Sequence, residues 1–78
     1  MKLCQVTGPL AVERRLAGLD QVAFVALRDD KGHTLAAADP LGVQTGDQVL
    51  VSEGGAPAAL GRNCPADALV VCVLAHRE

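Results

Sequence analysis

Aromatic residues are almost absent from this chain of 78 residues. There is no Trp and no Tyr, and Phe24 is the one aromatic side chain. Proteins that bind single-stranded nucleic acid stack the bases on aromatic rings, so the shortage argues against that class. Ile is also missing, and the apolar residues are mostly small, with 13 Ala, 10 Val and 11 Leu. Any core built from them is thin, as expected for so short a single domain spanning residues 1–78.

Positive charge is scarce as well. Seven Lys and Arg stand against nine Asp and Glu, for a net charge of −2, and Arg14-Arg15 is the one basic pair. Nucleic-acid binding would require clustered Lys and Arg. No apolar run approaches the roughly 18 residues of a membrane span. Met1-Lys2 is not followed by the apolar segment of a signal peptide. We therefore expect no nucleic acid and no membrane as partner, and a cytoplasmic location.

The three cysteines, an odd number, are irregularly spaced and form no Cys-x-x-Cys pair: Cys4, Cys64 and Cys72. Together with the histidines they match no zinc signature. Cys4 and Cys72 lie inside apolar runs, which is typical of small buried thiols. We therefore predict no metal site and no cofactor, and a reducing environment.

No catalytic constellation is evident. The two histidines, His33 and His76, lie beside a turn and near the chain end, where solvation is the expected state. Ser52 is the single serine and has no Gly-x-Ser-x-Gly setting. Three aspartates border predicted strands, namely Asp39, Asp47 and Asp67. Such carboxylates usually accept backbone N–H bonds in turns. We predict that the protein is not an enzyme and has no catalytic residue.

Hydrophobic patterning predicts five strands. Residues 2–12 alternate, with Leu3, Gln5 and Thr7 on one side and Cys4 and Val6 on the other, until Gly8-Pro9 imposes a bend, a bulge or an edge. The other strands are predicted over residues 22–28, 33–39, 47–53 and 68–75. A polar turn over residues 29–32 makes a hairpin of the second and third. Pro57 and Gly61 bound a short predicted helix between the fourth and fifth strands.

Five strands with short turns indicate a small closed or nearly closed β-barrel, an all-β fold. Residues 22–27 and 68–75 are apolar throughout, so both faces of those strands should be buried. A barrel has one interior, and 50% hydrophobic residues exceed what that interior needs. A neighbouring subunit is the simplest second cover, and we expect these two strands to supply core and subunit contacts.

Three segments, in this order, resemble the pentameric vertex proteins of bacterial microcompartments, the family shared by carboxysomes and by ethanolamine- or propanediol-type compartments. Residues 2–10 resemble the family's first strand with its Val-x-Gly. Residues 39–51 resemble its central segment of an Asp, spaced glycines, Gly-Asp and an apolar strand. Residues 65–71 resemble its closing Pro-x-Asp. The chain departs from the family at residues 54–58, Gly-Gly-Ala-Pro-Ala, where Gly-Ser-Ser-Ala-Arg is frequent, and at Ala75-His76, where an aspartate is common.

The resemblance implies an OB-like barrel, a cyclic homopentamer and a place at the vertices of a polyhedral shell, beside hexameric shell proteins on the facets. The candidate loops at the five-fold axis contain Gly42, Gly46, Ser52, Glu53, Gly54 and Gly55. Were the second loop to line an opening, Glu53 would make it acidic. The candidate contacts to neighbouring shell proteins are Arg14, Arg15 and Arg62.

An alternative hypothesis is a small OB-like binding module that acts as a monomer or dimer on a protein or small ligand. Oligomeric state separates the two hypotheses. An enzyme would need a convergent site that this sequence does not display. The type of microcompartment and its cargo enzymes stay open at this stage, since none of the three segments distinguishes them.

Overall fold

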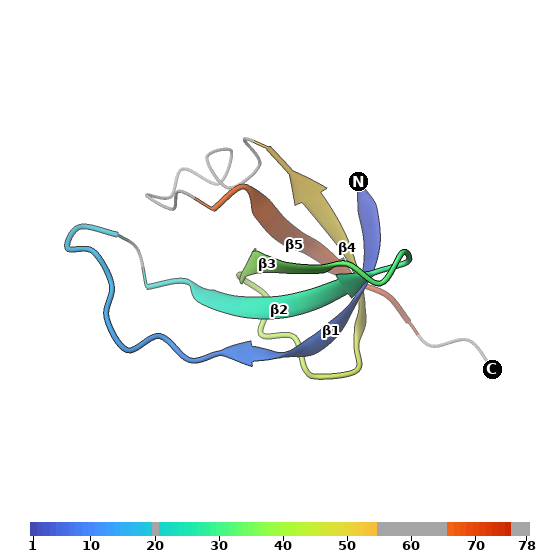
Figure 1. The fold of residues 1–78 in the computed structure, drawn as a ribbon, viewed down its shortest axis with the longest axis horizontal. Helices are drawn as coiled ribbons and strands as arrows, with labels where there is room; N and C mark the ends of the chain where they lie inside the picture. The colour runs from blue at the N-terminus through green and yellow to red at the C-terminus, as the bar shows by residue number, and fades with distance from the viewer. Residues whose placement is uncertain (20, 55–65, 76–78) are drawn as a thin grey trace.

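The computed structural model describes residues 1–19, 21–54 and 66–75. Five strands close into a barrel in the order β1-β2-β3-β5-β4 (Figure 1), which confirms the predicted all-β fold. The strands are β1 (Lys2–Leu10), β2 (Ala23–Asp29), β3 (Thr34–Asp39), β4 (Gln48–Glu53) and β5 (Ala68–Val73). The first and last strands end earlier than predicted. The helix predicted between Pro57 and Gly61 lies outside the described residues.

β1 is the strand that closes the barrel, because it pairs antiparallel with both β2 and β4. Its register with β2 shifts between Val6 and Gly8, which is the irregularity predicted near Gly8-Pro9. The Thr7 hydroxyl donates a hydrogen bond to the Ala26 carbonyl at 3.0 Å beside this shift. A bulge bends its strand and increases the local twist. β1 can therefore curve from one neighbour to the other.

The predicted hairpin of β2 and β3 is confirmed. Their register runs from Ala23 opposite Asp39 to Arg28 opposite Thr34. At the turn, the Gly32 N–H donates to the Asp29 carbonyl at 3.1 Å, and Gly32 has a φ of 82°. A side chain is strained at such a φ, so glycine is the fitting residue at this point.

The barrel interior is filled by small aliphatic side chains. Leu27, Val49, Val51 and Val70 are fully buried, and Leu35 and Val43 pack at the margin. The remaining core residues are Cys4, Val6, Val25, Ala37 and Ala68. The burial of Cys4 confirms its prediction as a core thiol. The interior contains no aromatic ring, which agrees with a barrel of only five short strands.

A second apolar cluster covers the outside of the barrel over β2, β3 and the start of β5. Phe24, Ala38 and Leu69 stand in one cross-strand row, and Val22, Ala66 and Val71 pack against them. The Arg15 guanidinium lies 5.2 Å above the Phe24 ring, a cation–π contact. The chain therefore covers this face in part, and Phe24 and Ala26 stay half-buried. That residues 22–27 contribute subunit contacts stays a prediction.

The end of β5 differs from its prediction. A register shift places Cys72 opposite Leu50, whereas Val70 is opposite Val51. Cys72 therefore points outward with Leu50, and its side chain is exposed. The prediction of a buried thiol at Cys72, made from the apolar run around it, is wrong for the single chain, because the register shift turns the side chain outward. Val73 is also exposed, so in the single chain both faces are buried only over the first half of the strand.

We predict that Leu27→Ala lowers the free energy of unfolding by about 2–5 kcal/mol, since truncating a fully buried Leu removes buried surface and leaves a cavity. Urea denaturation at fixed protein concentration measures the loss. Leu41→Ala is the matched control, because Leu41 is 52% exposed and should change the value by no more than about 0.5 kcal/mol. Equal losses for both variants would contradict the core described here.

Candidate functional site

The two loops predicted for a central axis lie at opposite ends of β4. Gly42 and Gly46 belong to the connection that enters the strand, and Ser52, Glu53 and Gly54 stand where it ends (Figure 1). A strand of this length separates its ends by roughly 17–20 Å. The structure does not bring these two groups together within one chain. Gly55 lies outside the described residues.

A buried carboxylate organises the loop that contains Gly42. Asp39 accepts three backbone N–H bonds, from Leu41 and Gly42 at 3.0 Å and from Val43 at 2.9 Å. This confirms the interpretation of Asp39 as a turn-capping group. Three donors satisfy its charge, so nothing in these contacts indicates a catalytic base. Val43 is thereby held against the barrel core.

The second half of the loop is fixed to β1. The Gly46 N–H donates to the Val6 carbonyl at 2.8 Å, and the Asp47 carboxylate accepts the Gln44 N–H at 2.9 Å. Gly42 and Gly46 have φ values of 73° and 93°, as their predicted role in the turn requires. The loop is therefore held by the Asp39 and Asp47 carboxylates and by β1.

The loop after β4 is attached differently. Gly54 has a φ of 79°, and its N–H donates to the Asp67 carbonyl at 2.7 Å, which links the end of β4 to the start of β5. Ser52 stands opposite Leu69 in the register of the two strands. In the described part of the chain, Ser52 thus lies in a β-ladder and not beside a histidine.

Glu53 belongs to an ionic cluster at the same end of β4. The Lys2 Nζ lies 3.3 Å from the Glu53 Oε1 and 3.7 Å from the Asp29 Oδ2. The hydrogen bond and charge of Glu53 raise the pKa of Lys2. The lysine therefore joins β1 to the ends of both β2 and β4. Sequence reasoning missed this cluster, because no local pattern shows that residues 2, 29 and 53 meet.

Asp29 is the most enclosed member of the cluster, with a side chain 4% exposed. Its Oδ1 accepts the His33 N–H at 2.8 Å and the Lys31 N–H at 3.0 Å. The His33 backbone bond is the main cause that lowers the pKa of Asp29, with further contributions from the Lys31 backbone and from the charges of His33 and Lys2. The carboxylate thus pins the β2–β3 turn and attracts the lysine of β1.

His33 is not part of a catalytic arrangement among the described residues. Its side chain is 75% exposed, and its Nδ1 lies 3.5 Å from the Asp29 Oδ2. Asp29 is already engaged by two backbone donors, and no third group completes a relay. His76 and Cys64 lie outside the described residues.

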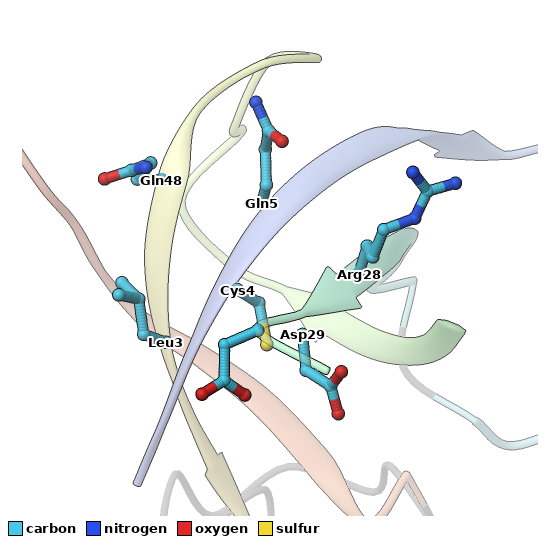
Figure 2. Close-up of a pocket in the computed structure, with 7 residues that line it drawn as sticks. Leu3, Cys4, Gln5, Arg28, Asp29 and Gln48 are labelled. Carbon is cyan, nitrogen blue, oxygen red and sulfur yellow. The ribbon is translucent and has the colours of Figure 1, made fainter. Parts of the chain in front are cut away.

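A pocket of about 220 Å³ opens beside β1 and is the hollow shown in Figure 2. It is lined by Leu3, Cys4, Gln5, Arg28, Asp29, Asp30 and Gln48. Gln5 and Arg28 extend away from one another in this view, and burial raises the pKa of the Cys4 thiol. A buried thiol of that kind is a poor nucleophile. Within the described chain, no group of three or more His, Cys, Asp or Glu could hold a metal ion.

The predicted basic contacts lie on a long connection between β1 and β2. We call residues 11–19 the arm, which projects away from the barrel strands (Figure 1). Arg14 is exposed on the arm, whereas Arg15 is partly buried over Phe24. Arg62 lies outside the described residues. The absence of a helix in the described part of the arm agrees with the predicted loop.

Family and structural comparisons agree with this fold. Residues 1–74 match the family model described as ethanolamine utilisation protein EutN/carboxysome. The chain belongs to this family. Its barrel is also similar to the pentameric shell protein MSM0273 from the RMM microcompartment, at 30% identity and a TM-score of 0.88, over 100% of this chain and 94% of that one. The resemblance seen in the sequence is confirmed.

Two further solved structures are similar to this chain. CsoS4B from Halothiobacillus neapolitanus matches at 25% identity and a TM-score of 0.83, over 96% of this chain and 100% of that chain. EutN from Escherichia coli matches at 26% identity and a TM-score of 0.82, over 95% of this chain and 85% of that chain. A search of curated proteins finds no match. In the described part of this family member, no helix is long and apolar enough to span a membrane.

Removing the Asp39 carboxylate should release the loop it caps. We expect Asp39→Ala to lower the free energy of unfolding by about 1.5–3 kcal/mol, because three backbone N–H groups lose their hydrogen bonds to a buried, charged carboxylate. Hydrogen exchange should accelerate at the amides of residues 41–43 in particular. Asp30→Ala, which removes an exposed carboxylate on the opposite turn, is the control. Unchanged exchange in Asp39→Ala would disprove the capping role.

The lowered pKa of Asp29 predicts how the stability of the fold depends on pH. Its pKa is lower in the folded chain than the ordinary value of about 3.9, so its stabilisation is present above that value and is lost as the pH falls through the folded-state pKa. Asp29→Asn should therefore destabilise the protein at neutral pH, and this deficit should shrink towards a pH of about 3. Urea unfolding at neutral pH and at the acidic pH tests this prediction, with Asp30→Asn as the control variant. A deficit that stays constant with pH would argue against the carboxylate as its source.

Proposed function

We propose that this protein is a structural subunit that assembles into a homopentamer and caps the vertices of a bacterial microcompartment shell. The observation that carries the proposal is the agreement of the whole barrel with the pentameric shell protein MSM0273, over 100% of this chain. Membership of the EutN/carboxysome family supports it. This role places the protein in the cytoplasm, as a part of the shell with no chemistry of its own.

Geometry supplies the reason for such a subunit. A flat sheet of hexagonal units cannot close, and five-fold units introduce the curvature that closure requires. Rings of identical subunits use one head-to-tail interface, repeated until it closes. The surface of the single chain supports assembly, since Leu3, Leu10, Val12, Leu16 and Val73 are all exposed. Where such side chains adjoin one another, they form the kind of apolar patch that another chain covers.

The partners on the shell facets would be hexameric shell proteins, and the arm is the candidate contact. Arg14 is exposed there and supplies positive charge. Arg15 is engaged with Phe24, which makes it a less available contact than its neighbour. Arg62 is retained as a candidate from its sequence position.

The two candidate loops would present different surfaces at the ring axis. The loop with Gly42 and Gly46 would present a rim held by Asp39 and β1. The loop with Ser52, Glu53 and Gly54 would present an ion pair in each subunit, because Lys2 lies 3.3 Å from Glu53. Five such pairs would give a weaker acidic field than five bare carboxylates. We therefore propose that any opening there is less acidic than Glu53 alone suggests.

Native mass spectrometry at low micromolar concentration tests the proposed assembly. We expect a dominant species at five times the chain mass of 8.0 kDa. A monomer or dimer that persists on concentration would overturn the proposal and favour a small OB-like binding module.

Charge reversal on the arm tests the facet contact. Arg14→Glu should leave the pentamer intact and reduce the fraction of closed shells, counted by electron microscopy after co-expression with hexameric shell proteins. Lys31→Glu makes the same charge change on the exposed β2–β3 turn and is the matched control. Equal shell closure in both variants would show that Arg14 makes no facet contact.

A further inference from the structure

We infer that neighbouring subunits join by seating the end of β1 and the arm of one subunit, with Leu10, Val12 and Leu16, on an outward apolar row of the next, formed by Leu3, Leu50 and Cys72. The inference rests on the proposed pentamer and names the two surfaces that would build it. The occupant of each surface is a second copy of this chain.

The apolar row crosses three adjacent strands. Leu3 of β1 is opposite Leu50 of β4, and Leu50 is opposite Cys72 of β5. The neighbours of the row in sequence, Cys4 and Val49, point into the core, so the row itself points outward. Leu3 and Cys72 are exposed and Leu50 is half-buried. Figure 2 shows Leu3 against β4, on the side of β1 away from Arg28.

Residues 1–19, 21–54 and 66–75 leave this outward row uncovered. The equivalent cross-strand row of Phe24, Ala38 and Leu69 is buried by Val22, Ala66 and Arg15 of the same chain. Ala38 is 1% exposed, whereas Leu3 is 47% exposed. Both rows are apolar, and among the described residues only the Phe24 row is covered by side chains of its own chain. The difference marks the Leu3 row as the face that a partner completes.

The second surface lies at the other end of the same strand. Leu10 is the last residue of β1, and Val12 and Leu16 follow on the arm, where Leu16 is 77% exposed. The arm turns back at its far end, where the Leu19 N–H donates to the Leu16 carbonyl at 3.4 Å and Gly18 has a φ of 88°. Arg15, in the middle of the arm, lies over Phe24, while its neighbour Leu16 stays exposed.

Two different patches at opposite ends of one strand are what a head-to-tail ring requires. Leu3 and Leu10 are seven positions apart in β1, or roughly 23 Å. A self-complementary patch would give a two-fold dimer, whereas two unlike patches let each subunit donate at one end and accept at the other. Both patches consist of apolar side chains, three of them on each. A second copy of the chain therefore satisfies both patches at once, which a foreign partner on one of them would not.

Disulfide cross-linking tests the contact directly. In a Cys64→Ser background, Leu10→Cys, Val12→Cys and Leu16→Cys are each made with the native Cys72 retained. After mild oxidation of dilute protein, we expect at least one variant to give a ladder of two to five linked chains on a non-reducing gel. Peptide mass mapping should locate the link between the arm cysteine and Cys72, since disulfides form only at Cα separations below about 7 Å.

Matched controls identify the link. Adding Cys72→Ser to the same variants should abolish the ladder. Lys31→Cys introduces a thiol on the exposed β2–β3 turn, outside both patches and both candidate axis loops, and should give no ladder. A pentameric protein in which none of the three arm cysteines links to Cys72 would overturn this interface and leave the proposed function standing. A wild-type protein that is monomeric would overturn both.

A charged side chain in the row gives an independent measurement. Leu50→Glu should abolish the species at five times 8.0 kDa while circular dichroism retains the strand signal, and Lys31→Glu, on the exposed β2–β3 turn, should keep the pentamer. A Leu50→Glu protein that stays pentameric would overturn the inference. Should that variant unfold, the cross-links decide, because the arm cysteines replace exposed residues.

Discussion

Closure of the barrel through β1 is the constraint on which the rest of the structure depends. A five-stranded sheet left open would expose two edges, and β1 removes both by pairing with β2 on one side and β4 on the other. The shift at Thr7 bends the strand between these neighbours. With the barrel closed, aliphatic side chains no larger than Leu suffice to fill the interior, which explains how a chain almost without aromatics has a defined core.

Charged side chains hold the loops between the strands of the closed barrel. Asp39 holds the β3–β4 loop by three backbone bonds, and Asp29 holds the β2–β3 turn by two. Lys2 extends this second site to Glu53, so the start of β1 is joined electrostatically to the ends of β2 and β4. Each buried carboxylate is satisfied by nearby partners, as a charge inside a small protein must be. Their chemistry is structural and agrees with a shell subunit.

The sequence predicted well what depends on local pattern. Strand alternation in residues 2–7, the turn at Gly32 and the capping by Asp39 are all set within a few residues, and the structure has them. Cys72 was misjudged because a register shift in β5 is decided by its pairing with β4, which lies outside any window on the strand itself. The Lys2 cluster escaped for the same reason, since its members come from three strands.

Apolar residues on the outer surface of the barrel relate the composition of the chain to its proposed assembly. A chain that is 50% hydrophobic has more apolar residues than its interior holds, and the structure divides the excess into two parts. One part, around Phe24 and Leu69, is buried by the chain itself. The other, around Leu3 and along the arm, stays exposed. In the ring proposed above, the Leu3 row and the arm would supply the contacts between subunits, whereas the Phe24 row is already packed against Arg15 of its own chain. The segment that carries Arg15 would then serve two apolar faces, one in its own subunit and one in its neighbour.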